Sequence, residues 1–284
     1  MDIDGTEIAR TIRASLAQEI VRKKYTPILA FFLMEDHAPS RVYVGMKERA
    51  CKECGITSIK HSLPKDVTEK NLVNLIMQAN NDPLIDAIIV QMPLPAHINA
   101  NTIIGAIAPE KDVDGFHPLN IGKMIVGEKT ALLPCTPLGI CKLLEMEQIK
   151  TSGKNIAILG RSLIVGRPLS NMLSQKGFDG TVTLLHSKST NIHLHLQKAD
   201  ILIAAIGIPH FVKKEMVKQG SVVIDVGINH LNGKLVGDVD YENVKDVCWK
   251  ITPVPGGVGP MTIAMLLHNT VKCHQMRLQA NLTL

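Results

Sequence analysis

Apolar residues follow two spacings along the first half of the chain, and the two spacings alternate. Residues 8–20 carry an apolar side chain every three or four positions, which predicts a helix, whereas residues 27–33 form a continuous apolar run that predicts a buried strand. The same pattern predicts further helices at 40–54 and 68–80, the second capped by Thr68, and further strands at 56–63 and 85–90. Such alternation is typical of an α/β fold with a mostly parallel sheet covered on both faces.

A second and more regular series of strands and helices follows residue 150. Strands are expected at 156–159, 181–185, 201–206 and 221–226, and the Pro- and Gly-rich segment from Pro253 leads into a final helix that begins near 262. We therefore predict two α/β domains, 1–138 and 139–261, with the helix 262–284 packing back on the first. The second series has the organisation of a Rossmann-like dinucleotide-binding domain.

Length and composition agree with two soluble domains. The chain has 284 residues, of which 45% are hydrophobic, so each half can bury its own core. No apolar run approaches the roughly 20 residues of a membrane-spanning helix. The N-terminus carries Asp2, Asp4 and Glu7 where a signal peptide would be basic and then apolar. We expect a cytoplasmic protein with no membrane partner.

Cysteine content and charge argue against two classes of site. The six cysteines, without an export signal, indicate reduced thiols, and the pair Cys51 and Cys54 has no second pair with which to complete a zinc site. The net charge of +5 is modest and aromatic residues are only 3% of the chain, so nucleic acid is a poor candidate ligand. A mildly basic protein suits small anions such as phosphates or a glutamate tail.

The turn after the first strand of the second series is a candidate phosphate site. Gly160 ends this strand and Gly166 begins the next helix, so backbone N–H groups and the helix N-terminus could face a phosphate. The spacing differs from GxGxxG. By itself the segment therefore fits an ordinary strand-to-helix turn equally well.

The next strand ends in residues that favour NADP over NAD. An NAD site places an Asp or Glu here for the ribose hydroxyls, but this chain reads His186-Ser-Lys-Ser-Thr190. Ser187, Lys188 and Arg161 could instead donate hydrogen bonds to a 2′-phosphate. The alternative is that Ser187 caps the next helix and Lys188 is solvated. The next two predicted strands end shortly before Gly207 and Gly227. These glycines either line a nicotinamide pocket or only allow the chain to turn.

Polar residues in the first half suggest proton chemistry. Tyr43 and Lys47 are spaced i,i+4 and share one face of a helix, where such a lysine is either a surface residue or a group that transfers protons in a pocket. Gln91 follows a buried strand and is held by a loop with two prolines. Asp112 and Asp114 are either turn formers or a carboxylate that pairs with the N–H groups of a ring.

Five short motifs occur together in a fixed order. They are YVxxK at 43–47, QxPLP at 91–95, KDVDGF at 111–116, GRSxxVGxP at 160–168 and TPVPGGVGPMT at 252–262. In this combination the chain resembles the bifunctional methylenetetrahydrofolate dehydrogenase/methenyltetrahydrofolate cyclohydrolase family. The resemblance implies a folate-contributing domain, an NADP-binding Rossmann domain, an active-site cleft between them, and a homodimer formed through the cofactor domains.

The resemblance also implies an activity and the residues that perform it. The enzyme would oxidise 5,10-methylenetetrahydrofolate with NADP and hydrolyse the methenyl product to 10-formyltetrahydrofolate. Lys47 would be the general acid/base of the hydrolysis, Gln91 would orient Lys47, Tyr43 would stack along the folate, and Asp114 would bind the pterin ring.

The remaining site residues implied by the resemblance belong to the second half. The positions that match contacts to the cofactor phosphates, or lie next to them, are Gly160, Arg161, Ser162, Gly166, Ser187 and Lys188. Those that match positions near nicotinamide and substrate are Ile228, Gly256, Gly257 and Pro260, with Pro260 expected as the first residue of the final helix. Two departures concern local loop shape: residues 32–37 lack an expected glycine, and Met92 replaces the usual leucine.

Three other functions are compatible with parts of this pattern. A dehydrogenase without cyclohydrolase activity would not need the set of Tyr43, Lys47, Gln91 and Asp114, and an NAD-linked enzyme would not need His186-Ser-Lys. A non-catalytic dinucleotide-binding protein would bind the cofactor without turning over folate.

Overall fold

The computed structural model of the chain describes residues 1–34 and 38–282, which form two compact α/β units. The three-stranded unit comprises Thr11–Cys135 and Ile263–Leu284, and the five-stranded unit comprises Met1–Arg10 and Thr136–Thr262. The predicted α/β fold with two parallel sheets is confirmed. Across the described ranges, none of the helices has the length and apolar character needed to cross a bilayer.

The N-terminal segment differs from the prediction, which grouped it with the first domain. Ile3 N–H donates to Ile251 O at 2.8 Å, and the Tyr241 hydroxyl donates to the Asp2 carboxylate at 2.6 Å. These bonds join Met1–Arg10 to the five-stranded unit. No local pattern reveals such a pairing, because the partners are separated by almost the whole chain.

The three-stranded unit has the predicted alternation of strands and helices. Its elements are the part of α1 (Gly5–Lys23) that follows Arg10, β1 (Ile28–Met34), α2 (Ala38–Cys54), β2 (Thr57–Leu63), α3 (Glu69–Asn81), β3 (Ala87–Val90), α4 (Ala100–Ala106), the 3₁₀ turn η1 (Pro109–Lys111) and α5 (Pro118–Ile125). The strands are parallel in the order β2-β1-β3. The side chain of Thr68 accepts from Asn71 N–H and caps α3 as expected.

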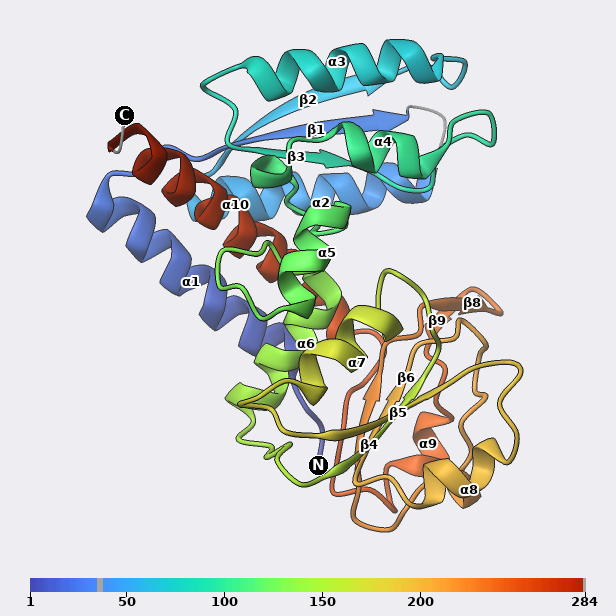
Figure 1. The fold of residues 1–284 in the computed structure, drawn as a ribbon. Coiled ribbons are helices and arrows are strands. Elements are labelled where there is room, and N and C mark those ends of the chain that lie inside the picture. Colours follow the sequence, from blue (N-terminus) through green and yellow to red (C-terminus); the bar gives the residue numbers. More distant parts are fainter. Residues whose placement is uncertain (35–37, 283–284) are drawn as a thin grey trace. The chain divides into compact units, whose positions relative to one another are not determined.

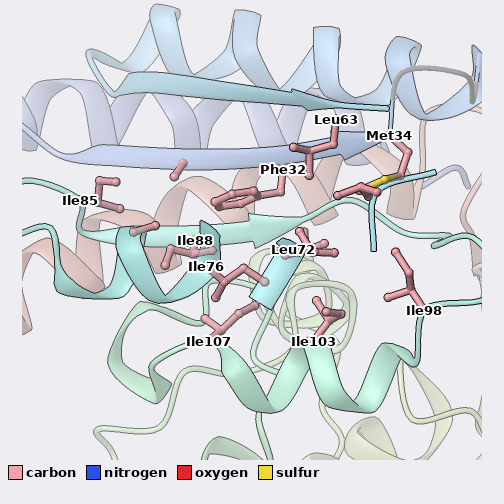
Figure 2. Packing of buried hydrophobic residues seen from close by; sticks show 14 residues of the cluster. Phe32, Met34, Leu63, Leu72, Ile76, Ile85, Ile88, Ile98, Ile103 and Ile107 are labelled. Carbon is pink, nitrogen blue, oxygen red and sulfur yellow. The ribbon is translucent and has the colours of Figure 1, made fainter. Parts of the chain in front are cut away.

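The sheet is buried on both faces, which explains the continuous apolar run in β1. Ala30, Phe32 and Met34 point to one face and pack with residues of α3 and α4, as Figure 2 shows for Leu72, Ile76 and Ile103. Leu29, Phe31 and Leu33 point to the opposite face and are also buried. Figure 1 shows α3 and α2 on opposite sides of these strands.

The final helix, α10 (Val258–Leu282), contributes residues 263–284 to the three-stranded unit. The carboxylate of the buried Asp86 accepts from Arg277 Nε at 2.5 Å, lies 3.1 Å from His274 Nδ1, and also accepts from Ile28 N–H. The helix begins two residues before Pro260, not at it. A proline is tolerated there because the first-turn N–H groups have no partner inside the helix.

The five-stranded unit contains the second series of elements. They are α6 (Cys135–Met146), β4 (Asn155–Leu159), α7 (Gly166–Ser174), β5 (Thr181–Leu185), α8 (Ile192–Gln197), β6 (Ile201–Ala204), η2 (Lys214–Met216), β7 (Val222–Asp225), β8 (Asn229–Leu231), β9 (Lys234–Val236), α9 (Tyr241–Val244) and β10 (Lys250–Ile251). The parallel sheet has the order β10-β7-β6-β4-β5, and β8 and β9 form a separate antiparallel hairpin.

Candidate active site

Lys47 and Gln91 meet in the three-stranded unit. Lys47 lies on α2 and Gln91 directly after β3, and the lysine Nζ donates to Gln91 Oε1 at 2.9 Å. Gln91 is fixed in turn, because its Nε2 donates to Met92 O at 2.7 Å and its backbone N–H donates to Phe32 O at 2.9 Å. The acceptor of Lys47 is therefore a rigid group at the end of a buried strand.

Tyr43 lies one helical turn before Lys47 on α2. The i,i+4 spacing places both side chains on one face of the helix. The tyrosine is 38% exposed, so part of its ring is accessible to a flat ligand. Residues 35–37, part of the segment 32–37 that lacks the expected glycine, lie outside the described part of the chain.

Lys111, the first residue of the KDVDGF motif, has a structural role. Its buried Nζ donates to three backbone oxygens, those of Ala79, Asn80 and Asp82. These carbonyls lie at and just after the C-terminus of α3, where a cation is favourable. Lys111 thus anchors η1 to α3.

Asp112 also has a structural role. It is 1% exposed, pairs with Ile88 beside β3, and accepts from His117 N–H at 2.7 Å and from Asn120 Nδ2 at 3.0 Å. A further bond comes from Gly115 N–H. Asp112 is therefore the turn former among the two aspartates.

Asp114 is the carboxylate that the fold leaves available. Within the described ranges no side chain or backbone N–H donates a hydrogen bond to it, and it is only half-buried. Burial raises the pKa of Asp114 to about 6, the positive charge of Lys47 acts in the opposite direction, and Asp112 raises the pKa further. Lys47 and Asp114 thus lie close enough for their charges to interact.

The loop that carries Asp114 is held from two sides. Gly115 has φ +74°, and a Cβ at this position would lie 2.5 Å from Leu133 C, so only glycine fits. The Nδ2 of the buried Asn269 on α10 donates to Val113 O and to Leu133 O, each at 2.9 Å. Asp114 is therefore presented on a rigid loop.

The cysteine pair on α2 is part of the core and not of this site. Cys51 and Cys54 are buried, and burial raises the pKa of Cys51 to about 12 and that of Cys54 to about 11. Both thiols therefore stay protonated at neutral pH.

The cofactor candidates lie along one edge of the five-stranded sheet. Because the strands are parallel, the loops after them meet at the carboxyl edge, and the strand order places them in the sequence Ser187, Gly160, Gly207, Ile228 and Gly256. Gly160 N–H donates to Leu185 O at 2.9 Å, which joins the first two loops.

The turn from β4 to α7 is too tight for side chains at either glycine. A Cβ on Gly160 would lie 2.1 Å from Ala205 O, and one on Gly166 would lie 1.8 Å from Gly160 O. Arg161 and Ser162 are exposed on this turn, and Ser162 Oγ accepts from Val165 N–H at 3.1 Å. Backbone this close to a helix N-terminus, with exposed polar side chains, fits the phosphates of a dinucleotide.

The loop after β5 keeps Ser187 and Lys188 exposed. His186 N–H donates to Ser189 Oγ, and Lys188 N–H donates to His186 Nδ1, so the turn is held by its own residues. The N-cap of α8 is Asn191, so the alternative that Ser187 caps this helix is wrong.

The remaining candidates follow β7 and β10. Ile228 is 47% exposed after β7. Gly256 has φ +104°, and a Cβ on Gly257 would lie 2.6 Å from Pro253 O, so the segment before Pro260 is closely packed. All three residues Gly256, Gly257 and Pro260 belong to the five-stranded unit, whereas Tyr43, Lys47, Gln91 and Asp114 belong to the three-stranded unit.

Two buried aspartates bind the loops at the carboxyl edge of the five-stranded sheet, which we call the cofactor edge, and the sequence did not predict this role for them. Asp225 ends β7 and Asp238 follows β9, and both accept several backbone hydrogen bonds. The only local signal is an acidic residue in an apolar or glycine context, in VIDVG and VGDV.

Both halves of the chain match models of one family. Residues 3–114 match the catalytic domain, and residues 134–278 the NAD(P)-binding domain, of tetrahydrofolate dehydrogenase/cyclohydrolase. The chain belongs to this family. The bifunctional protein FolD of a Sulfurihydrogenibium species is 48% identical over 280 residues, which cover 97% of this chain and 98% of the relative.

Solved structures of family members are similar throughout. The bifunctional enzyme FolD from Campylobacter jejuni is 44% identical, with a TM-score of 0.94 over 98% of this chain and 99% of that one. The FolD of Trypanosoma brucei, solved with NADP cofactor and inhibitor, is 33% identical, with a TM-score of 0.93 and 98% of each chain covered. The family predicted from the five motifs is therefore confirmed.

Proposed function

We propose that this family member oxidises 5,10-methylenetetrahydrofolate with NADP and hydrolyses the methenyl product to 10-formyltetrahydrofolate. The observation that carries the proposal is the hydrogen bond from Lys47 to Gln91 beside the available carboxylate of Asp114. This observation supports the proposal because the residues that we assign to proton transfer, to orientation of the lysine and to pterin binding all belong to one unit of a chain that also has the family's NAD(P)-binding domain.

Substrate binding is assigned to Asp114 and Tyr43. The ionised carboxylate of Asp114 can accept two N–H groups from the edge of the pterin, and the exposed ring of Tyr43 stacks along the folate. When bound, NADP supplies the acceptor for the hydride that leaves the one-carbon bridge. The residues mainly orient the substrate in this step, because a resonance-stabilised methenyl cation forms with little acid/base help.

Lys47 carries the hydrolysis. Water attacks the methenyl carbon and the neutral amine form of Lys47 takes one proton from it, which leaves a neutral carbinolamine. When the carbon–nitrogen bond breaks, the Lys47 ammonium protonates the departing ring nitrogen. The carbinolamine hydroxyl loses its proton as the formyl C=O forms, so one proton is released to solvent overall. Gln91 Oε1 accepts a hydrogen bond from the Lys47 amine, so the amine is already oriented for proton transfer before the reaction begins.

The cofactor edge supports NADP as the partner of this chemistry. Gly160 and Gly166 form the close backbone approach for the phosphates, with Arg161 and Ser162 exposed beside them. Ser187 and Lys188 are exposed where an NAD site would have a carboxylate, so they can contact a 2′-phosphate. Ile228, Gly256, Gly257 and Pro260 are assigned to the nicotinamide and substrate side.

A Lys47→Met variant tests the proposal. Methenyltetrahydrofolate hydrolysis should fall by at least about 100-fold, the lower range for general acid/base catalysis, while methylenetetrahydrofolate oxidation with NADP partly survives. Lys52→Met is the matched control, because Lys52 is exposed on the same helix and both activities should persist. Hydrolysis near the wild-type rate in Lys47→Met would remove the assigned role.

Three further parts of the proposal concern context. We assign the folate function to residues 11–138 with the final helix 262–284, and the cofactor function to 139–261 together with residues 1–10. The enzyme acts in the cytoplasm as a homodimer formed through the cofactor domains. Analytical ultracentrifugation at micromolar concentration should give twice the chain mass of 31.0 kDa, and a monomer would contradict the dimer.

A further inference from the structure

Two loops at the cofactor edge share one buried acceptor. The carboxylate of Asp238, which is 0% exposed, accepts from Ile206 N–H at 2.7 Å and Gly207 N–H at 3.0 Å through Oδ2. Its Oδ1 accepts from the Nδ2 of Asn229 at 2.9 Å. The first two donors follow β6 and the third follows β7, so one side chain joins the loops after neighbouring strands.

Asp225 fixes the place of Asp238. The Asp225 Oδ1 accepts from Asp238 N–H at 2.9 Å and from Gly227 N–H at 3.0 Å, and its Oδ2 accepts from Val239 N–H at 2.9 Å. Thr252, directly after β10, binds the backbone of Asp225, because its Oγ1 accepts from Asp225 N–H at 2.7 Å. The backbone on both sides of Asp238 is thereby attached to the end of β7.

The glycines around this pair show how closely the backbone wraps it. A Cβ on Gly227 would lie 2.3 Å from Asp238 Oδ1, and a Cβ on Gly237 would lie 1.8 Å from Asp225 Oδ2. The buried N–H groups of these segments are not paired within a β-sheet. The two carboxylates accept hydrogen bonds from them in place of water.

The two loops held by Asp238 end in exposed apolar side chains. Ile208 is 50% exposed and directly follows Gly207, whose N–H is bound to Asp238, and Ile228 is 47% exposed and directly follows Gly227, whose N–H is bound to Asp225. Apolar side chains on rigid backbone suit the face of a flat ring. The proposed function assigns Ile228, on the loop after β7, to the nicotinamide side, and Gly207, on the loop after β6, is the neighbouring candidate along the same sheet edge.

We propose that Asp238 is the positioning residue of the nicotinamide pocket, which sets the loops after β6 and β7 in one fixed arrangement without contacting the cofactor. This inference rests on the proposed function for the identity of the ligand. It predicts that weakening the Asp238 bonds lowers cofactor affinity and leaves the chemistry of Lys47, in the other unit, intact.

The test compares Asp238→Asn with the wild-type enzyme. The amide of asparagine has the size of the carboxylate, but it replaces one acceptor oxygen by an NH₂ donor. That NH₂ would face the N–H groups that now donate to the oxygen, so the hydrogen bonds to that oxygen are lost. The Kd for NADP, measured by calorimetry, should rise about tenfold or more. Amide hydrogen exchange in the cofactor-free protein should accelerate at 206–207 and 227–229. Methenyltetrahydrofolate hydrolysis should stay within about twofold of wild type.

A second, milder variant tests the proposal in case Asp238→Asn does not fold. Asn229→Ala removes one donor from a half-buried side chain and should raise the Kd for NADP in the same direction by a smaller factor. Asp200→Asn is the matched control. Its carboxylate also accepts a backbone N–H, that of Asn155 at 2.9 Å, but it lies at the opposite edge of the sheet, before β6. That variant should leave the Kd unchanged.

The outcomes separate the two proposals. Unchanged Kd and unchanged exchange in both Asp238→Asn and Asn229→Ala would overturn the positioning role, even if the wild-type enzyme performs both reactions. An equal rise of Kd in Asp200→Asn would also overturn it, because the effect would then be general loss of stability. A wild-type enzyme that binds NADP but oxidises no methylenetetrahydrofolate would contradict the proposed function alone.

Discussion

Lys47 Nζ lies 2.9 Å from Gln91 Oε1, across 44 residues of chain and from a helix to the end of a strand. The glutamine is itself fixed by bonds to Met92 O and Phe32 O. The lysine amine is therefore oriented in the protein without substrate, and the group that orients it can be changed separately from the lysine.

The first prediction concerns that orienting group. Gln91→Met keeps the length of the side chain and removes the acceptor, so methenyltetrahydrofolate hydrolysis should fall about tenfold or more while its KM changes little. Gln78→Met, at an exposed position of α3, should leave the rate unchanged. Stopped-flow loss of methenyl absorbance measures both variants. An equal loss in the two would show that Gln91 has no special role.

The second prediction concerns the pH dependence of substrate binding. Burial raises the pKa of Asp114 to about 6, so the carboxyl gains its proton below that pH and can no longer accept two N–H groups. The kcat/KM for methylenetetrahydrofolate should fall as the pH drops through about 6, and not first near 4. Asp225 also has a pKa raised to about 6, so the wild-type profile alone does not identify the group.

Asp114→Asn separates the two carboxyls. This variant should have a lower kcat/KM at neutral pH and should lose the acid limb of the profile. A limb near pH 6 that persists in Asp114→Asn belongs to another group and contradicts the assignment.

The third prediction contrasts two glycines. Gly166→Ala places a Cβ 1.8 Å from Gly160 O and should destabilise the protein by about 1–3 kcal/mol and abolish detectable NADP binding. Gly105→Ala lies within α4 with no atom in reach of the new Cβ, and should stabilise the protein by about 0.5–1 kcal/mol. Urea denaturation and calorimetry measure both variants. Normal NADP binding by Gly166→Ala would exclude this turn from the phosphate site.

The fourth prediction concerns the attachment of α10. Asp86→Ala removes the partner of Arg277 and His274 and an acceptor of Ile28 N–H, so the free energy of unfolding should fall by about 3 kcal/mol. Amide hydrogen exchange in 270–280 should rise most. Glu53→Ala removes an ion pair with Arg13 in which the Glu53 side chain is 56% exposed, and should change stability by less than about 0.5 kcal/mol. An equal change in the free energy of unfolding for the two variants would show that the hydrogen bonds of Asp86 do not stabilise the protein.

Most of the fold was predictable because its signals are local. The apolar run of β1 and the Thr68 cap of α3 each depend on neighbours in sequence, and the structure has both. The hairpin of β8 and β9 also has a local signal, because Asn232 and Gly233, which connect the two strands, have positive φ, as an Asn-Gly pair in a two-residue hairpin turn requires. The short helices α4 and α5 have too few turns to give a clear apolar period.

The site was predictable only in part, because its supporting contacts are long-range. The bond between Lys47 and Gln91 agrees with a role that came from family resemblance. The function of Lys111 depends on carbonyls about 30 residues away, and that of Asp238 on loops about 10 and 30 residues before it. Residue type and spacing do not encode such partners.

The segment from Lys111 to Gly115 has a consequence for tracing the evolution of the family. Lys111 anchors a helix end, Asp112 forms the turn, and Gly115 is required by close backbone contact, so three of the named positions serve folding. Only Asp114 is left for a ligand. A duplicated copy of the gene that lost catalysis would remain under selection at the other three, and a change at Asp114 alone would mark it as a pseudoenzyme.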